Sequence, residues 1–423
     1  MRRSTRGSTI AVALCALALI AAGDVPEPTE EQAAALAIAC DEPFEPTGET
    51  VPAGVVATDI EVTTADGSTV TGCLVHPSGD AAIRDLVVFV HGQGHTVQNA
   101  WRRHQWEVAE HGAATIAVNF RDNFAFPTHQ GAEDVLAATD WALERFPDVE
   151  RTILFGVSMG GAVSGTALVK SAEVQAGLYD LWFDVEGVSM VWETWAEARA
   201  AEPAIADGIE RDMGGTPLDV PDRYVDGSPA MNADAMVTAG LQGAVLVHAP
   251  FDGRVAYWQG REMALALDMV GIPYEFHTVV QGNGSEAGSD STPLKLVPGV
   301  GNDLEDVSDQ TLGLAGHASE RDPNHPVMRT ALDRLVQVID GAALAPSEYV
   351  ADLGGPSDEP SDGEPSEPTD PPDGDTPSEG DTSSDGGTSV GRSDTSTLPE
   401  TGGGLAVLAL ALLGTAGVSR RRR

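Results

Sequence analysis

The segment from Arg151 to Gly161 places a serine where nucleophilic chemistry is favoured. It reads Arg-Thr-Ile-Leu-Phe-Gly-Val-Ser-Met-Gly-Gly, so an apolar, β-branched run meets a Gly-x-Ser-x-Gly pentapeptide centred on Ser158. The small residues after it predict a helix. A serine at such a strand-to-helix turn has an exposed hydroxyl, and Gly156 and Gly160 leave space for the crossing chains. The pentapeptide alone is also compatible with an ordinary tight turn, so its interpretation depends on the rest of the chain.

Three other segments place polar residues after predicted strands or before a helix. Asp85–Val90 is apolar throughout, as a buried parallel strand requires, and leads into His91-Gly-Gln-Gly-His95. Ala244–Ala249 is a second buried strand, and Asp252 follows it. His317 lies among small residues ahead of a final helix. Histidine and aspartate are residue types that can assist a serine nucleophile as base and acid.

This series of motifs resembles the α/β-hydrolase superfamily, in which the nucleophile, the acid and the histidine follow one another in the order Ser158, Asp252, His317. The resemblance implies an α/β-hydrolase fold and a serine hydrolase. His317 would remove the proton of the Ser158 hydroxyl during attack on a carbonyl carbon and return it to the leaving group. Asp252 would orient the imidazole and stabilise its charged form. An acyl-enzyme forms and water releases it.

The resemblance also assigns the oxyanion hole. In this superfamily a His-Gly-x element after an early strand contributes backbone donors, which correspond here to the N–H of Gln93 and, as a further donor, Gly94. The N–H of Met159, directly after the nucleophile, is the other donor. Loss of one such donor typically costs about 10²–10³ in rate. The side chain of His91 is interpreted as structural.

The assignment of the base has a rival. Between the last predicted strand and His317 lies an insertion, residues 281–316, where a short loop would be usual. His325 lies just before the final helix and is the alternative base. His317 is preferred because small residues surround it. His248 and His277 fall inside predicted strands and are interpreted as core histidines.

Apolar patterning predicts a mostly parallel sheet with helices on both faces. Helical patterns alternate with strands, and a hairpin precedes them on one edge of the sheet. The predicted helices are residues 97–111, 131–146, 258–269 and 326–339. The predicted strands are residues 55–63, 68–77, 85–90, 114–120, 151–155, 185–191, 244–249 and 273–280. We expect one domain over residues 52–345.

Two insertions depart from this alternation. Residues 192–240 stand where the superfamily inserts a cap, and its large side chains are compatible with either an acyl pocket or ordinary packing, so they receive no role: Trp192, Trp195, Met213 and Tyr224. The 281–316 insertion is acidic, and a calcium site there is the alternative to a solvated loop. It lacks the spacing of a calcium-binding loop, so we predict no metal, and no cofactor is expected.

Both ends of the chain predict export. Residues 1–23 combine a basic start with an apolar run and small residues, which is typical of a secretory signal peptide. Residues 24–51 form an N-terminal extension. Residues 346–397 are rich in Pro, Ser, Asp and Gly and predict a disordered spacer.

The final residues, 398–423, resemble the sorting signal of Gram-positive cell-wall proteins. The pentapeptide consists of Leu398, Pro399, Glu400, Thr401 and Gly402. An apolar stretch and four terminal arginines follow it. The resemblance implies sortase and peptidoglycan as partners, cleavage between Thr401 and Gly402, and attachment to the wall. A single short membrane-spanning helix is the alternative interpretation.

Two of the three cysteines remain after removal of the signal peptide, Cys40 and Cys73. In an exported protein such a pair predicts a disulfide that joins the N-terminal extension to the first hairpin. Two buried free thiols are the alternative. Thr29-Glu-Glu-Gln32 fits a capping box at the start of a short helix before Cys40.

The charge excludes some partners and suggests an environment. The net charge is −41, and residues 24–350 contain 51 acidic against 16 basic side chains. Such a surface repels nucleic acid and anionic membranes. It suits a protein kept soluble at high salt, where self-repulsion is screened.

Three functions are compatible with these features. The first is a secreted, wall-anchored serine esterase. The second is a peptidase, because residues 246–280 also resemble the catalytic domain of prolyl-oligopeptidase-type and dienelactone-hydrolase-like enzymes, although the chain leaves little room for a propeller domain. The third is a non-catalytic binding module on a hydrolase fold.

Overall fold

The computed structural model describes residues 29–44, 48–79, 81–250, 252–281, 316–318, 320–322 and 324–352. All of them lie in the first of two compact units, residues 1–359. The predicted signal peptide, the acidic insertion from residue 282 to 315, most of the spacer and the sorting signal lie outside the described residues.

The described residues form a nine-stranded sheet in the order β1-β2-β4-β3-β5-β6-β7-β8-β9. β2 runs antiparallel to β1 and β4, and all other neighbours are parallel. The strands are β1 (Val55–Thr63), β2 (Thr69–Pro77), β3 (Asp85–Val90), β4 (Ala114–Val118), β5 (Arg151–Val157), β6 (Leu181–Val185), β7 (Gly243–His248), β8 (Tyr274–Gln281) and β9 (Ser347–Asp352). The mostly parallel sheet and its edge hairpin are confirmed.

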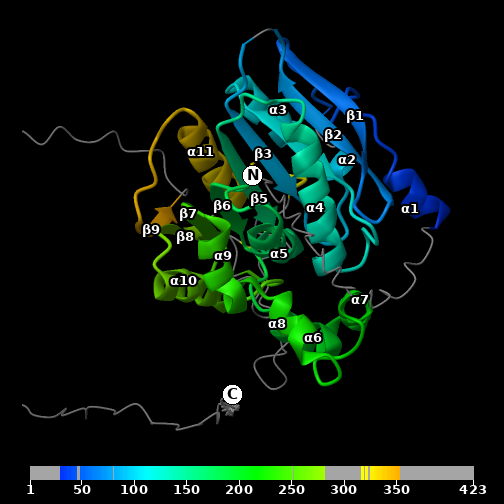
Figure 1. The fold of residues 1–423 in the computed structure, drawn as a ribbon, viewed down its shortest axis with the longest axis vertical. Coiled ribbons are helices and arrows are strands. Elements are labelled where there is room, and N and C mark those ends of the chain that lie inside the picture. The colour runs from blue at the N-terminus through cyan, green and yellow to red at the C-terminus, as the bar shows by residue number, and fades with distance from the viewer. Residues whose placement is uncertain are drawn as a thin grey trace, which may run out of the picture. The chain divides into compact units, whose positions relative to one another are not determined.

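Helices cover both faces of the sheet (Figure 1). One apolar core contains buried side chains of α4 (Thr128–Leu143), α5 (Met159–Val174), α9 (Ala233–Ala239) and α10 (Tyr257–Val270). The other contains those of α2 (Val97–Ala100), α3 (Arg102–Glu110) and α11 (Pro326–Ile339). α11 has the predicted bounds, whereas the helix predicted over 97–111 is divided at Trp101. The central strands are buried on both faces because helices cover them both.

The strand predicted at residues 185–191 is wrong. The strand is β6, Leu181–Val185, and the following residues turn away from the sheet. Glu186 has a positive φ of 47°, which ends the extended conformation. Further on, the N–H groups of Ser189 and Met190 donate to the Gln259 side chain on α10 instead of to a neighbouring strand. Apolar alternation alone therefore misplaced the strand by about four residues.

The segment predicted as a cap contains five short elements. They are α6 (Val191–Ala201), α7 (Pro203–Met213), α8 (Pro221–Asp226), a 3₁₀ helix η1 (Pro229–Asn232) and α9. Side chains of α9 pack in the same core as α5 and α10, so the segment returns to the main body before residue 240. The part that departs from the strand-helix alternation is α6 to η1.

The C-terminal boundary of the domain also differs from the prediction. β9 pairs in parallel with β8, from Glu275 opposite Ser347 to Gln281 opposite Asp352. The sheet therefore includes residues that the sequence analysis assigned to the spacer. Their short, mixed composition hides a strand that forms only because β8 offers a free edge.

Cys40 and Cys73 form a disulfide with a Cα–Cα distance of 5.8 Å, as predicted. Both residues are fully buried. The bond joins the segment after α1 (Glu30–Ala35) to β2, and the capping box of Thr29 and Gln32 at α1 is present as well.

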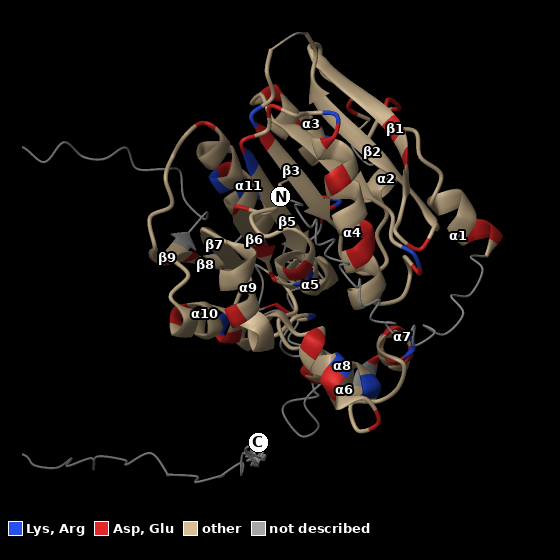
Figure 2. Cartoon of the chain, in the orientation of Figure 1, with Lys and Arg blue, Asp and Glu red and all other residues tan. Residues whose placement is uncertain are grey.

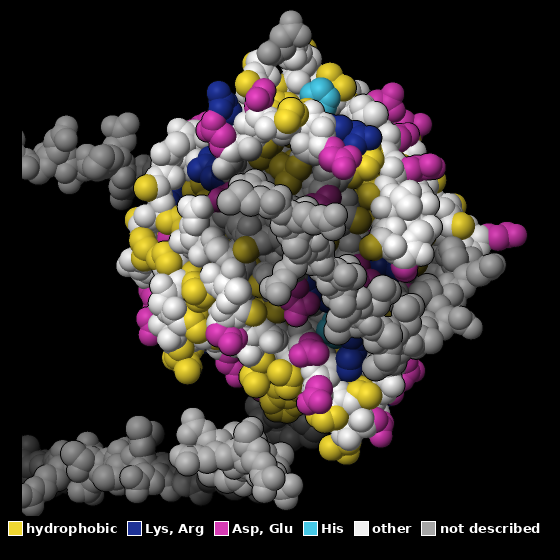
Figure 3. All heavy atoms as spheres, viewed as in Figure 1, with side chains coloured by type: hydrophobic (Ala, Val, Ile, Leu, Met, Phe, Trp, Pro, Cys, Tyr) yellow, Lys and Arg dark blue, Asp and Glu magenta, His cyan; other side chains and the backbone are white. Residues whose placement is uncertain are grey.

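Acidic side chains outnumber basic ones on the surface. Figure 2 shows Asp and Glu on most elements with few Lys and Arg, and Figure 3 shows acidic side chains spread over the visible face. No helix among the described residues is long and apolar enough to span a membrane.

Candidate active site

Ser158 lies at the turn between β5 and α5 in a strained backbone conformation. Its φ is 57° and its ψ is −123°, values that non-glycine residues rarely adopt. The turn is tight: a Cβ on Gly156 would overlap the carbonyl oxygen of Gly160, and one on Gly160 would overlap that of Val90. The two glycines therefore allow α5 to cross β3 and β5 closely enough to present the serine hydroxyl at the carboxyl edge of the sheet.

The structure brings Ser158, His317 and Asp252 together. The Oγ of Ser158 lies 3.0 Å from Nε2 of His317. Nδ1 of the same ring lies 2.7 Å from Oδ2 of Asp252. With the proton on Nδ1, the imidazole donates to Asp252 and accepts from the serine hydroxyl, which is the arrangement a general base requires.

Asp252 is held as an ionised acid. Its Oδ1 accepts the N–H groups of Arg254 and Val255, at 2.7 and 2.9 Å. Burial alone would raise the pKa of Asp252, but the charge of His317 and hydrogen bonds from His248 and His317 outweigh it and hold the pKa below its ordinary value. The carboxylate can therefore orient and stabilise the imidazolium.

The predicted oxyanion donors are free for a substrate. Neither the N–H of Gln93 nor that of Met159 donates to another described residue. Gln93 and Ser158 line the same cavity, and Met159 opens α5, whose first N–H groups have no partner within the helix. The further donor, Gly94, lines the cavity too. Backbone donors near Ser158 without another partner among the described residues suit a developing negative charge.

A cavity of about 370 Å³ opens beside Ser158. Its apolar lining includes Phe126, Val188 and Ile205, and its charged lining includes Glu197 and Arg254. α6 and α7 contribute part of this lining, so the cap segment does form one wall of the site. The four large side chains named from the sequence are not among the described lining residues. Met213 and Tyr224 are instead buried in the core, and Trp195 donates to Glu210.

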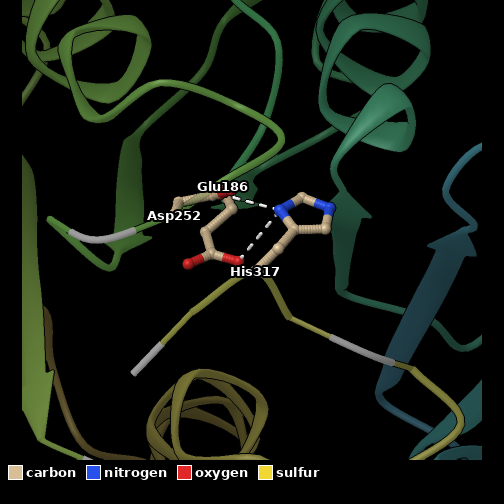
Figure 4. Close-up of side chains that lie close together, drawn as sticks. All are labelled: Glu186, Asp252 and His317. Atoms are coloured by element: carbon tan, nitrogen blue, oxygen red, sulfur yellow. Dashed lines mark hydrogen bonds and ion pairs between the residues drawn. The ribbon is translucent and has the colours of Figure 1, made fainter. Parts of the chain in front are cut away.

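Glu186 is a site residue that the sequence analysis missed. Its carboxylate lies 3.4 Å from Nδ1 of His317, on the same ring nitrogen that Asp252 contacts (Figure 4). Glu186 directly follows β6, and the residue after a central parallel strand is a signal that could have found it. The misplaced strand prediction put Glu186 inside an extended segment instead.

A second missed pair joins the oxyanion loop to the histidine loop. Oε1 of Glu320 accepts the N–H of Gly92 at 2.6 Å, and Oε2 lies 2.5 Å from Nδ1 of His95. Burial would raise the pKa of Glu320, but His95 and these hydrogen bonds lower it to about 2. Burial opposes ionisation of His95 as well, but the charge of Glu320 raises the His95 pKa overall. The pair is therefore an ion pair at mildly acidic pH.

Among the described contacts, the other histidines named from the sequence do not reach the Ser158 hydroxyl. His325 caps α11 and does not take the position next to Ser158. His91 is buried, stacks on Phe120, and has its pKa lowered by burial to about 4, so it is neutral and structural. His277 pairs with Glu275 at 3.0 Å. His248 is buried as predicted, and its Nε2 also lies 3.5 Å from Asp252.

Glu186, Asp252 and His317 are also the only described group with metal-ligand chemistry close together, within 4.8 Å. Each of these side chains already has hydrogen-bonding partners in this group or on the backbone. We therefore assign no metal to the group.

The comparisons with known proteins agree with a hydrolase. Residues 111–285 match the family model described as prolyl oligopeptidase family. No curated protein matches the chain.

Solved structures of peptidases and esterases are similar to the chain at low identity. An acylaminoacyl peptidase of Pyrococcus horikoshii has 18% identity and a TM-score of 0.43 over 53% of this chain and 37% of that one. A puromycin-hydrolyzing peptidase of Mycobacterium tuberculosis has 17% identity and a TM-score of 0.49 over 72% and 42%. A carboxyl esterase of Tuber melanosporum has 16% identity and a TM-score of 0.49 over 71% and 90%.

The chain spans about two fifths of the length of the two peptidases. Its sheet order, with one antiparallel edge and the serine turn after β5, is that of the α/β-hydrolase fold. The chain therefore has an α/β-hydrolase fold, and its residues 111–285 are similar to the prolyl oligopeptidase family.

Proposed function

We propose that this protein cleaves carboxylic esters through an acyl-enzyme formed on Ser158. The observation that carries the proposal is the continuous contact from Ser158 Oγ through His317 to Asp252, at 3.0 and 2.7 Å. A serine hydroxyl is a weak nucleophile unless a base takes its proton as it attacks.

The proposed reaction has two halves. Oγ of Ser158 attacks the carbonyl carbon while its proton passes to Nε2 of His317, and the N–H groups of Gln93 and Met159 bind the oxyanion. Collapse of the tetrahedral intermediate breaks the bond to the alcohol, which takes the proton from Nε2. Water then attacks the acyl-enzyme with His317 again as base. The acid is released and the Ser158 hydroxyl is restored.

The cavity supports a small acyl group. Phe126, Val188 and Ile205 offer apolar surface next to Ser158, which favours an aliphatic or aromatic acyl chain. A peptide substrate is the second candidate, because the matched family model describes peptidases. Both substrates would use the same acyl-enzyme.

A substrate panel separates the two. We expect p-nitrophenyl esters of short acyl chains to be hydrolysed with higher kcat/KM than aminoacyl anilides. The Ser158→Ala variant should hydrolyse neither. Faster turnover of the anilides would replace the esterase proposal with the peptidase one, and turnover unchanged in Ser158→Ala would remove both.

We also propose that the enzyme is exported and joined to the cell wall. The supporting features are the N-terminal apolar run and the Leu398–Gly402 pentapeptide with its apolar stretch and arginines. Sortase would cleave after Thr401 and link this residue to peptidoglycan. Mass spectrometry of muralytic digests should find Thr401 joined to wall peptide in a sortase-positive host. Release of the full-length chain, ending in its four arginines, would contradict the proposal.

A further inference from the structure

Two carboxyl groups from neighbouring strands face one nitrogen of the base. Nδ1 of His317 lies 2.7 Å from Oδ2 of Asp252 and 3.4 Å from Oε2 of Glu186 (Figure 4). Glu186 follows β6, and Asp252 follows β7, its parallel neighbour. A Ser-His-Asp site needs one acid at this nitrogen, so the second requires an explanation.

Glu186 connects the two loops that carry the other site residues. Its Oε1 accepts the N–H of Ala249, at 3.1 Å, on the segment that leads to Asp252. Its Oε2 accepts the N–H of Ala318, directly after His317. Its own N–H donates to the carbonyl oxygen of Val247 at 2.8 Å. The Glu186 side chain therefore holds the backbone of two segments, the one that leads to Asp252 and the one that carries His317.

The backbone of Glu186 is unfavourable for its residue type. A φ of 47° is uncommon for a residue other than glycine, asparagine or aspartate, and such strain persists when surrounding contacts require it. The side chain is fully buried. A buried carboxyl in a strained backbone, with both oxygens engaged beside the base, indicates a role at the site.

The pKa values of the two carboxyl groups are shifted in opposite directions. Burial first, and then the charge of Asp252, raise the pKa of Glu186 well above its ordinary value, whereas the pKa of Asp252 is lowered. The titratable groups that face Glu186 are Asp252 and His317, with His248 next to Asp252. Burial and the neighbouring charge therefore favour the proton on Glu186 and the negative charge on Asp252.

We propose that Glu186 is a positioning residue for the proposed hydrolase reaction, which holds the His317 loop in place and acts as a reserve acid for Nδ1. When Asp252 is neutralised, Glu186 releases its proton to solvent and supplies the negative charge at Nδ1. In the intact site it stays neutral and leaves that role to Asp252. This inference rests on the proposed function.

The test compares kcat/KM for a p-nitrophenyl ester in Asp252→Asn, Glu186→Gln and the double variant. Asp252→Asn should retain part of the wild-type kcat/KM. The kcat/KM of the double variant should be lower again by a factor of roughly ten or more. Glu186→Gln alone should lose less than about tenfold, because Asp252 still orients the base. Equal activity of Asp252→Asn and the double variant would overturn the proposal.

A matched control distinguishes a negative charge supplied by Glu186 from the general effect of losing a buried carboxyl. Asp212 is another buried carboxyl with a raised pKa, about 6 because of burial, and it accepts the N–H groups of His129 and Gln130. Asp212→Asn combined with Asp252→Asn should lose no more than Asp252→Asn when activity is expressed per folded molecule. A loss as large as that of the Glu186 double variant would show a general effect of buried carboxyls and overturn the proposal.

The pH profile is the readout that a purely structural role would not move. The pH profile of kcat/KM for Asp252→Asn should contain an ionisation of Glu186 that is absent from the profile of the double variant. If the double variant does not fold, infrared spectra serve instead: the difference between wild type and Asp252→Asn at neutral pH should contain a neutral-carboxyl band that is lost in the variant. A difference spectrum without that band would overturn the proposal. Failure of wild type to hydrolyse any ester or anilide would instead remove the proposed function.

Discussion

At the scale of the residue, the site depends on a strained serine and on glycines that have no room for a side chain. The sequence predicted Ser158, Asp252 and His317 because each lies in a local motif of its own. Glu186 and Glu320 carry no such motif: they reach the site only through tertiary contacts between segments far apart in the chain. The sequence preferred His317 over His325 because of its small neighbours, and the structure places His317 next to Ser158.

Replacement of Gly160 by alanine tests the crowding at the serine turn. The added Cβ would overlap the carbonyl oxygen of Val90, so we expect a loss of about 1–3 kcal/mol in the free energy of unfolding and a large fall in kcat/KM. The control is Gly112→Ala, whose φ of 94° makes it strained although no atom lies near the new Cβ. It should lose stability and retain activity per folded molecule. Full activity in Gly160→Ala would contradict the crowding argument.

Exchange of each histidine for alanine tests the identity of the base. His317→Ala should lower kcat by orders of magnitude, because no other described base contacts Ser158 Oγ. His325→Ala should keep most of the turnover, with a lower thermal midpoint because its side chain is buried at the start of α11. The reverse order of activities would assign the base to His325.

At the scale of the element, the sequence predicted most strands because central parallel strands are continuously apolar. It failed at β6 and β9 for different reasons. β6 contains Asp184 and ends at Val185, directly before Glu186, so the apolar alternation beyond it was the stronger signal. β9 is a short edge strand whose formation depends on β8. The loops that carry the site are joined by side chains, which patterning does not reveal.

Glu320→Gln tests the link between the oxyanion loop and the histidine loop. Because the pKa of Glu320 is lowered to about 2 from 4.5, its contribution is present above pH 4.5 and lost as the pH falls towards 2. Because the pKa of His95 is raised from 6.5, its contribution is present below pH 6.5 and lost as the pH rises through the folded-state value. The stability difference between wild type and Glu320→Gln should therefore be largest between pH 4.5 and 6.5.

Urea unfolding across the pH range measures that difference. The variant should also have a lower kcat/KM, since Glu320 holds the Gly92 N–H next to the oxyanion donors. A stability difference that does not vary with pH would show that the ion pair contributes nothing.

At the scale of the whole molecule, composition predicted features that do not depend on a local motif. The disulfide was predicted from the number of cysteines in a chain expected to be exported, and the acidic surface was predicted from the net charge of −41. Export, anchoring and adaptation to salt remain predictions.

Removal of the disulfide should destabilise the fold without altering the chemistry. The bond closes a loop of 33 residues, and constraint of the unfolded chain is worth about 3–4 kcal/mol. The Cys40→Ser/Cys73→Ser variant should show this loss in urea unfolding, with kcat unchanged where it is folded. An unchanged free energy of unfolding would mean that the N-terminal segment contributes no constraint.

Salt should stabilise the protein because it screens repulsion among the acidic side chains. We expect the thermal midpoint to rise with sodium chloride concentration, and to rise less in a variant with several exposed glutamates replaced by glutamine. A midpoint that is highest in salt-free buffer would contradict adaptation to salt.

The central claim is that His317 activates the hydroxyl of Ser158. The most direct measurement is labelling by a fluorophosphonate, followed by peptide mapping of the modified residue. Wild type should be labelled on Ser158. Labelling should be lost in Ser158→Ala and greatly slowed in His317→Ala. Labelling at another residue, or equal labelling of wild type and Ser158→Ala, would contradict the account.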